Sequence, residues 1–318
     1  MRITVVGDAL LDVDVDGTSE RLAPDAPVPV VDVERREDRA GGAGLAATLL
    51  ARDGHEVELV TAIAEDAGGQ RLRARLDGVR LVAAGSNAPT PVKTRIRANG
   101  HLIARIDEGG AGGLPQPGPE VLAAIAAAEL LVVADYGRGM TAHPGVRAAL
   151  ERRGAAVPLV WDPHPRGADP VASADTVTPN LSEAARAAGL PAGGVPAAAE
   201  ASRLLAERWG CRAVVVTLGA AGALLREPGA AAPLLLPAPS IAAADPCGAG
   251  DRFATSLAVA LAEGLARAEA VGRAVEEATA FIAGGGVAGL RVPAVPSLAI
   301  TTRRRALRAD EDRRRETA

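Results

Sequence analysis

Short apolar runs alternate with amphipathic stretches along most of the chain. The first run, residues 3–6, is β-branched and ends at Gly7-Asp8, which is typical of a buried strand. Later apolar runs of strand length follow helix-like stretches. Polar or glycine residues stand directly after most of these runs. This alternation predicts a doubly wound α/β fold, a mostly parallel sheet with helices on both faces and ligands at the carboxyl ends of the strands. The further predicted strands are 57–60, 130–134, 158–161, 176–178 and 213–217, and the predicted helices are 45–52, 66–76, 120–129, 196–209, 251–262 and 268–283.

Two regions do not fit this alternation. Between residues 10 and 39, scattered valines alternate with Asp, Pro and Gly, which favours exposed strands over a helix. Residues 92–97 and 101–106 flank Asn99-Gly100, a dipeptide that favours a tight hairpin. We expect these strands, within about 13–40 and 90–107, to form a small β lid over the site.

Composition narrows the class of protein. The 318 residues carry a net charge of −4 with both signs interspersed, so nothing indicates a nucleic-acid surface. Two cysteines are too few for a disulfide framework or a metal cluster. We see no signal peptide and no apolar run of membrane-spanning length, and we therefore expect a cytoplasmic protein. Residues 1–302 are predicted to form one domain, followed by a charged, flexible tail at 303–318.

The most informative stretch is Asp245-Pro246-Cys247-Gly248-Ala249-Gly250-Asp251, which leads into an apolar helix. Residues 248–250 carry almost no side chain, so a ligand can approach their backbone N–H groups at the positive end of the helix. A carboxylate beside such a phosphate cradle makes sense if Asp251 takes a proton from an attacking hydroxyl. The alternative is a glycine-rich turn that caps a core helix.

Three further patterns carry candidate chemistry, each with a plainer alternative. Asp12 follows the first strand and is an acceptor for sugar hydroxyls or a turn aspartate. Asn180 and Glu183 share a helical turn, where they position Mg²⁺ through water or form an N-terminal cap. Thr217-Leu218-Gly219-Ala220-Ala221-Gly222 is a strand-end turn suited to a nucleotide, and Asp135-Tyr136-Gly137 contacts substrate or is a simple turn. There is no Walker loop and no protein-kinase motif set.

Together these stretches resemble the ribokinase-like (PfkB) family of sugar kinases, from about residue 2 to 302. Within that family, the unusual string at residues 21–30 makes the chain most similar to kinases that phosphorylate carbon 1 of D-glycero-D-manno-heptose 7-phosphate. The resemblance rests on Val6-Gly7-Asp8, Leu11-Asp12, Arg21-Leu22-Ala23-Pro24-Asp25-Ala26-Pro27-Val28-Pro29-Val30, Gly41-Gly42-Ala43, Lys93, Arg105-Ile106-Asp107, Asp135-Tyr136, Thr178-Pro179-Asn180-Leu181-Ser182-Glu183 and Gly248-Ala249-Gly250-Asp251.

The resemblance implies an ATP- and Mg²⁺-dependent kinase with a role for each matching residue. Asp251 would be the catalytic base, with Gly248, Ala249 and Gly250 as the anion hole. Asp245 would help to hold a monovalent cation such as K⁺, and the lid strands would pair in a homodimer. The nucleotide and its Mg²⁺ would be served by Asn180, Glu183, Thr217, Gly219, Gly222 and Thr279, and the sugar phosphate by Asp12, Gly41, Gly42, Lys93, Arg105 and Asp135.

Three positions depart from the family pattern. Leu45 stands where a sugar-facing asparagine is usual, His164 replaces the lysine of an Asp-Pro-Lys-Gly turn, and Thr279 stands for an asparagine near adenine. A kinase for another sugar, sugar phosphate or nucleoside therefore stays open, as does a sugar-binding module without catalysis. Because Asp251 and its loop are intact, we expect a working kinase.

Overall fold

In the residues that the structure describes, a nine-stranded sheet forms the centre of the fold. The structure is a computed structural model, and it describes residues 1–109, 112, 114–191, 193–242 and 245–290. The strand order is β13-β12-β11-β10-β9-β8-β1-β4-β5, in which the strands from β11 to β5 run parallel and β12 runs antiparallel to both neighbours. The doubly wound α/β fold predicted from the sequence is confirmed. The strands are β1 (Arg2–Gly7), β4 (Glu56–Ala62), β5 (Val79–Ala84), β8 (Leu130–Ala134), β9 (Leu159–Asp162), β10 (Thr176–Val177), β11 (Val214–Thr217), β12 (Ala223–Arg226) and β13 (Leu234–Leu236).

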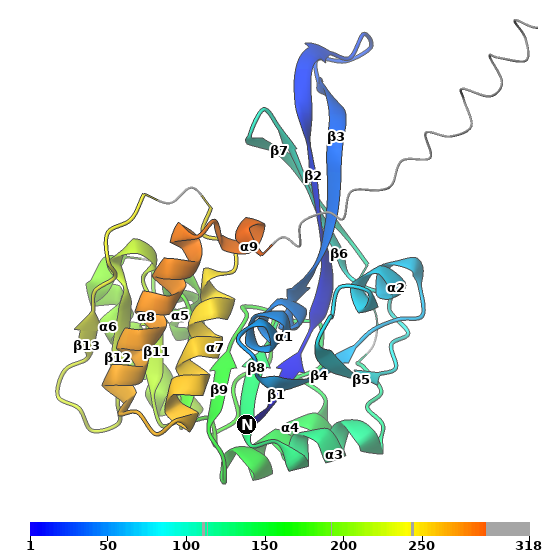
Figure 1. Cartoon of the computed structure of the whole chain (residues 1–318). Helices are drawn as coiled ribbons and strands as arrows, with labels where there is room; N and C mark the ends of the chain where they lie inside the picture. Colours follow the sequence, from blue (N-terminus) through cyan, green and yellow to red (C-terminus); the bar gives the residue numbers. More distant parts are fainter. Residues whose placement is uncertain (110–111, 113, 192, 243–244, 291–318) are drawn as a thin grey trace, which may run out of the picture. The chain divides into compact units, whose positions relative to one another are not determined.

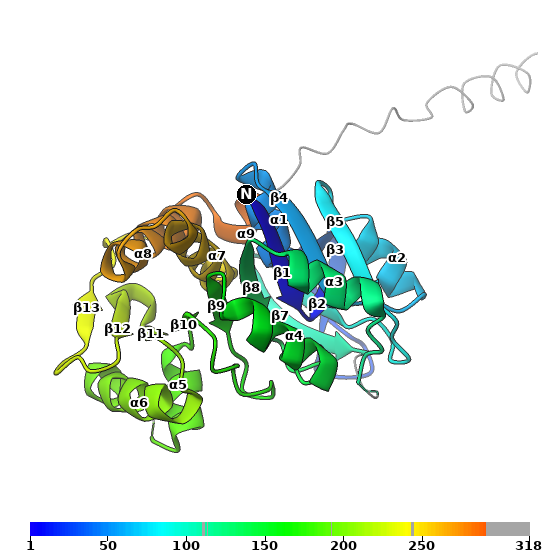
Figure 2. The same ribbon diagram turned by 90° about the horizontal axis from the view of Figure 1, so that it is seen from below.

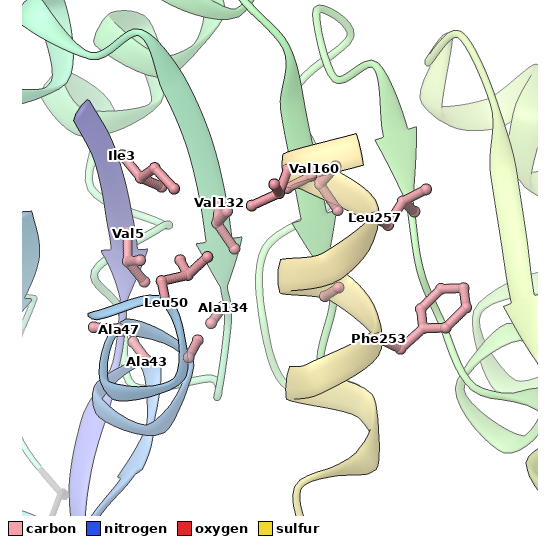
Figure 3. Packing of buried hydrophobic residues seen from close by; sticks show 14 of the residues in the cluster. Ile3, Val5, Ala43, Ala47, Leu50, Val132, Ala134, Val160, Phe253 and Leu257 are labelled. Atoms are coloured by element: carbon pink, nitrogen blue, oxygen red, sulfur yellow. The ribbon is translucent and has the colours of Figure 1, made fainter. Parts of the chain in front are cut away.

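Alternating side chains of the buried strands build a hydrophobic core on each face of this sheet. Ile3 and Val5 of β1 point to one face and Val6 to the other, as the two-residue period of a strand requires. Figure 3 shows Leu50 of α1 and Leu257 of α7 packed over the first face, and α3, α4 and α6 cover the second (Figure 2). The helices are α1 (Ala43–Arg52), α2 (Ala67–Arg73), α3 (Pro119–Ala127), α4 (Pro144–Gly154), α5 (Leu181–Ala188), α6 (Gly194–Trp209), α7 (Ala249–Ala262), α8 (Arg267–Ala283) and α9 (Gly286–Gly289).

The predicted lid is a separate sheet with the strand order β3-β2-β6-β7. Its strands are β2 (Ala9–Leu22), β3 (Pro29–Gly42), β6 (Val92–Ala98) and β7 (His101–Glu108), and they extend away from the central sheet in Figure 1. Asn99 and Gly100 both take positive φ angles, 51° and 80°, at the predicted hairpin turn. β2 begins two residues after β1 ends, so the lid is longer than the sequence indicated.

The two faces of the lid differ in chemistry. One face carries acidic and basic side chains that pair across the strands, such as Asp14 with Arg39 and Arg97. The other face is mainly apolar and forms a groove with a volume of about 610 Å³, which Arg36, Arg71 and Glu108 also line. Val33 at 57% and Ile106 at 46% are among its most exposed large side chains. Exposed apolar faces of this kind are typical of interaction surfaces.

Three strands were missed in the sequence because their local pattern is weak: β5, β12 and β13. The chain divides into two units, residues 1–286 and 287–318, and the central sheet and the lid both belong to the first. The predicted tail at 303–318 lies outside the described residues, and the boundary at 302 stays a prediction. None of the described helices is long and apolar enough to cross a membrane.

Candidate active site

Carboxylates stand at the carboxyl ends of three adjacent parallel strands. Asp8 follows β1, Asp135 follows β8, and Asp162 is the last residue of β9. Asp8 is buried and accepts hydrogen bonds from the backbone N–H groups of Tyr136 (3.1 Å) and Arg138 (2.8 Å). Asp8 therefore fixes the loop that follows β8. This loop lies at the carboxyl ends of the strands, where such sheets bind their ligands.

Asp135 is buried in a network of its own. Its Oδ1 accepts from the Gly137 N–H at 2.7 Å, and its Oδ2 accepts from the Thr141 hydroxyl at 2.7 Å and the Ala168 N–H at 3.1 Å. Burial raises the pKa of the Asp135 carboxyl to about 6. Both oxygens already hold the surrounding loops, and the predicted contact with the sugar stays a prediction.

The glycine-rich loop ends as the sequence predicts, at the start of α7. Gly248 is the N-cap residue and has a φ of 83°, a left-handed conformation that glycine adopts without strain. A Cβ added at Gly250 would meet no heavy atom within 4 Å, so the space beside this backbone is open. The N–H groups of a first helical turn lack intrahelical partners. The Ala249 N–H donates to the Pro246 carbonyl at 3.1 Å, so the open space for an anion lies beside the backbone of Gly250.

Asp251 lies on that first turn and is buried, with 8% of its surface exposed. The hydroxyl of Tyr136 donates a hydrogen bond of 2.9 Å to its Oδ1. Burial raises the pKa of the Asp251 carboxyl to about 7, against an ordinary value of 3.8, although the Tyr136 hydrogen bond opposes the shift. A carboxyl with a pKa near the working pH is suited to general base catalysis.

Asp162 is a partly buried carboxyl that sequence reasoning did not assign to the site. It accepts a hydrogen bond of 3.0 Å from the Thr178 hydroxyl. Burial, and then the negative charges of Asp251 and Glu183, hold its pKa well above the ordinary value. Its position at the end of a strand, before Pro163, was the feature of the sequence that could have indicated a place in the site. The packing of α7 against β9 brings Asp162 toward Asp251.

Asp12 lies on β2, on the polar face of the lid, and is 4% exposed. Its Oδ2 is 2.9 Å from Arg39 Nη1 and its Oδ1 is 2.6 Å from Arg95 Nη1. Both carboxylate oxygens are thus engaged in ion pairs within the lid. Its predicted contact with sugar hydroxyls stays a prediction, and a structural role is already evident.

Lys93 and Arg105 lie on β6 and β7 of the lid. The Arg105 guanidinium is 2.6 Å from Asp107, whereas Lys93 makes no ion pair with any residue in the described part of the chain. Burial lowers the pKa of the Lys93 ammonium, Asp12 opposes this, and Arg95 and Arg105 lower it further. Lys93 therefore lies near two arginines and has no carboxylate within ion-pair distance in the described part of the chain.

Gly41 and Gly42 end β3 at the base of the lid. A Cβ at Gly41 would lie 2.3 Å from the Asp12 carboxylate, and one at Gly42 would lie 2.5 Å from the Asp8 carbonyl. Gly42 also has a φ of 59°, a conformation that favours glycine. The structure explains both glycines by close packing, and their predicted role in sugar binding remains open to test.

Asn180 and Glu183 form the N-terminal capping box of α5. Asn180 Oδ1 accepts from the Glu183 N–H at 3.0 Å, and Glu183 Oε2 accepts from the Asn180 N–H at 2.9 Å. Burial raises the pKa of the Glu183 carboxyl. The cap uses Oε2 of the glutamate, and the predicted role of Asn180 and Glu183 in positioning Mg²⁺ stays a prediction.

The predicted nucleotide-binding turn follows β11. Gly219 has a φ of 59°, and a Cβ there would meet nothing within 4 Å, so its surroundings are open. A Cβ at Gly222 would instead lie 2.0 Å from the Leu236 carbonyl, and this glycine is required for packing on β13. Thr217 ends β11 and pairs with Asn180 in an isolated bridge. The Thr279 hydroxyl donates to the Val275 carbonyl of its own helix at 2.7 Å.

Asp245 connects the loop before α7 to the lid. Its Oδ1 accepts from the Cys247 N–H at 3.0 Å, and its Oδ2 is 3.3 Å from Arg97 Nη2. The Arg95 guanidinium lies 3.9 Å from Cys247 Sγ. Two lid arginines thus contact the loop that precedes Asp251. The predicted role of Asp245 in holding K⁺ stays a prediction.

The residues present fit a hydrated Mg²⁺ carried on a nucleotide. No group of three or more His, Cys, Asp or Glu side chains is placed to bind a metal directly in the described residues. Burial raises the pKa of Asp162, Asp251 and Glu183, and Asp162 lies close enough to feel the charges of the other two. A cation between this acidic region and the phosphates would relieve their repulsion.

The chain belongs to the pfkB family of carbohydrate kinases, whose pattern it matches over residues 1–293. Members of this family are ATP-dependent phosphotransferases that use Mg²⁺. The site described above, with a buried carboxyl on the first turn of a helix after a glycine loop, therefore lies in a sugar kinase fold.

The chain is similar to several curated proteins. It is 47% identical over 292 residues to the bifunctional protein HldE of Streptomyces coelicolor, which covers 91% of this chain and 61% of that protein. It is 36% identical over 274 residues to the HldE of a Caulobacter species, covering 82% of this chain and 55% of the relative. The chain thus spans about three fifths of the length of the relatives that it matches.

Solved structures confirm the fold. Arabidopsis thaliana ribokinase, determined with ribose and ATP, superimposes with a TM-score of 0.67 at 23% identity, covering 88% of this chain and 92% of that one. The tetrameric inhibited form of phosphofructokinase-2 from Escherichia coli gives a TM-score of 0.68 at 16% identity, covering 90% and 94%. The predicted ribokinase-like fold with a lid is therefore confirmed.

Proposed function

We propose that the protein phosphorylates D-glycero-D-manno-heptose 7-phosphate at carbon 1, with ATP as donor. The observation that carries the proposal is the position of Lys93, a half-buried lysine without an ion-pair partner in the described residues, close enough to Asp251 to lower its pKa. A sugar that already carries a phosphate supplies the missing anion. The 47% identity to HldE of Streptomyces coelicolor and the string at residues 21–30 support the same substrate.

The residues of the chain have distinct tasks in this reaction. The carboxylate of Asp251 accepts the proton of the attacking sugar hydroxyl, and the first-turn N–H groups of α7 stabilise charge on the transferring phosphoryl group. Glu183 and Asn180 would position the hydrated cation that the nucleotide carries. When bound, Mg²⁺ would neutralise charge on the phosphates of ATP. Lys93 and Arg105 hold the phosphate at the far end of the sugar and so align its hydroxyl with the base.

The substrate is tested by incubating the full chain with Mg·ATP and one sugar at a time. The panel contains heptose 7-phosphate, unphosphorylated heptose, ribose, fructose 6-phosphate and adenosine, and ADP release is measured. We expect turnover of heptose 7-phosphate that the Asp251→Asn variant lacks. Turnover of another sugar instead would keep the mechanism and reject this substrate. ATP binding without ADP release on any sugar would favour a binding module without catalysis.

A Lys93→Gln variant tests the recognition of the distal phosphate. We expect a KM for heptose 7-phosphate about tenfold or more higher, because a charged hydrogen bond to phosphate is lost, with little change in the KM for ATP. Arg203→Gln, on the exposed face of α6, is the matched control for loss of one positive charge. Equal KM values for Lys93→Gln and the wild type would place the sugar phosphate elsewhere.

We further propose that two copies pair through the apolar face of the lid, in the cytoplasm where ATP is available. The groove of about 610 Å³ on that face is lined by side chains of all four lid strands, and Val33 and Ile106 in it are largely exposed. A second copy presents the same apolar surface, so the two faces can cover each other and exclude water. K⁺ activation through Asp245 is a separate part of the proposal, tested by exchanging K⁺ for Na⁺ in the ADP assay.

A further inference from the structure

Tyr136 is the only tyrosine in the chain, and its hydroxyl is aimed at the carboxylate of Asp251. The hydroxyl donates to Oδ1 at 2.9 Å. Among the described residues, no other side chain donates a hydrogen bond to this carboxylate. If the ring served only to fill space, a phenylalanine would pack equally well and leave Asp251 free to rotate.

The backbone and ring of Tyr136 are both held in place. The Tyr136 N–H donates to Asp8 Oδ2 at 3.1 Å, so the loop after β8 cannot move independently of β1. The ring stacks on the His164 imidazole, with centroids 6.1 Å apart and planes at 25°. Gly42 lies against its edge, where a Cβ would approach to 3.3 Å. A hydroxyl fixed this firmly can fix its acceptor.

We propose that Tyr136 is a positioning residue for the catalytic base, and this inference rests on the proposed function. Its hydroxyl holds Oδ1 of Asp251 and leaves Oδ2 to accept the proton of the sugar hydroxyl. In the step itself, the sugar O–H bond breaks, its proton goes to Oδ2, the sugar oxygen bonds to the γ-phosphorus, and ADP leaves with the electrons of the bridging P–O bond. Tyr136 keeps its own proton throughout.

The charge state of Asp251 depends on groups from four elements. Tyr136 after β8 and Lys93 of β6 favour its ionised form, whereas Asp12 of β2 and Asp162 of β9 disfavour it. Tyr136 is the nearest of the favourable groups, because it makes a hydrogen bond to the carboxylate itself. Loss of its hydroxyl should therefore raise the pKa of Asp251 and delay the formation of the base as pH rises.

The first test is the pH profile of the Tyr136→Phe variant. Removal of one hydrogen bond to a carboxylate should move the acidic limb of kcat/KM upward by about one pH unit. The loss of activity should then be about tenfold greater at pH 6 than at pH 9, with the KM for ATP unchanged. His164→Ala, which removes the stacking partner and keeps the hydroxyl, is the matched control. An unshifted limb in Tyr136→Phe would overturn the proposal.

A second variant tests the same bond without removing it. Because Tyr136 is the only tyrosine, growth on 3-fluorotyrosine changes this one hydroxyl and leaves the rest of the chain unaltered. The fluorinated phenol is a stronger donor, so the acidic limb should move to lower pH, opposite to the phenylalanine variant. A shift in the same direction as Tyr136→Phe, or none, would contradict a donor role.

A measurement without substrate separates this inference from the proposed function. The Asp251 carboxyl is titrated by NMR in protein labelled with ¹³C at the aspartate side chains, with Asp251→Asn identifying its signal. Tyr136→Phe should raise the midpoint of that titration by about one pH unit. If no sugar is phosphorylated but the midpoint moves, the proposed function fails and the hydrogen bond stands. If activity is present and the midpoint is unmoved, Tyr136 does not tune the base.

Discussion

The substitution Asp251→Asn should remove catalysis and also stabilise the folded protein, and the second effect can be worked out from the structure. Burial holds the pKa of the Asp251 carboxyl at about 7 in the folded chain, against 3.8 for an exposed aspartate. At a pH above both values the unfolded chain carries the charge in water, whereas the folded chain carries it in a buried site. Asparagine has nearly the same shape and can still accept the Tyr136 hydrogen bond.

The sign and the pH window follow from proton linkage. Between pH 4 and 7 the folded state holds one proton more than the unfolded state, so the stability of the wild type falls as pH rises through this range. A difference of about three pKa units corresponds to roughly 4 kcal/mol at the plateau above pH 7. Asp251→Asn avoids this loss, and its advantage over the wild type should grow from near zero at pH 4 to a few kcal/mol at pH 8.

Urea unfolding at pH 4.5, 6 and 8 measures this advantage. Asp32→Asn is the control, because its carboxylate lies on the exposed end of the lid and is solvated in both states. Asp251→Asn should also lower kcat by about 10² to 10⁴, the usual contribution of a general base. A stability difference that is the same at all three pH values would refute the buried-charge argument, even if activity were lost.

Three other perturbations test separate parts of the molecule. Asp12→Ala leaves the Arg95 guanidinium without a carboxylate partner and should lower the free energy of unfolding in urea by about 3 kcal/mol; a loss below 1 kcal/mol would show that the ion pair contributes little. Glu183→Gln keeps the capping box, so Tm should stay the same while the Mg²⁺ concentration for half-maximal activity rises about tenfold. A changed Tm with an unchanged Mg²⁺ dependence would show that Glu183 acts only as a helix cap. Val33→Lys places a charge on the apolar lid face and should give monomers in sedimentation experiments, whereas Val195→Lys on α6 should not; a persistent dimer would exclude this face.

Much of the candidate site could be predicted from sequence because its chemistry lies in contiguous stretches. The segment from Gly248 to Asp251 carries both the helix start and the acidic side chain, and local physics alone places that acid on the first turn of the helix. Asn180 and Glu183 are likewise three residues apart, and the capping box that they form was one of the two interpretations made. The hairpin at Asn99 and the β/α alternation also depend on neighbouring residues, and both are confirmed.

The tertiary structure alone decided which distant groups meet Asp251. Tyr136 is 115 residues away in the sequence and Lys93 is 158, and no local pattern indicates that either faces this carboxyl. Asp162 lies close enough to interact electrostatically with it because α7 packs against β9. Sequence determined that an acid stands on the first turn of α7. The packing around it decided that this acid is buried, accepts a hydrogen bond from one phenol and has a pKa of about 7, because desolvation depends on what surrounds a group in space.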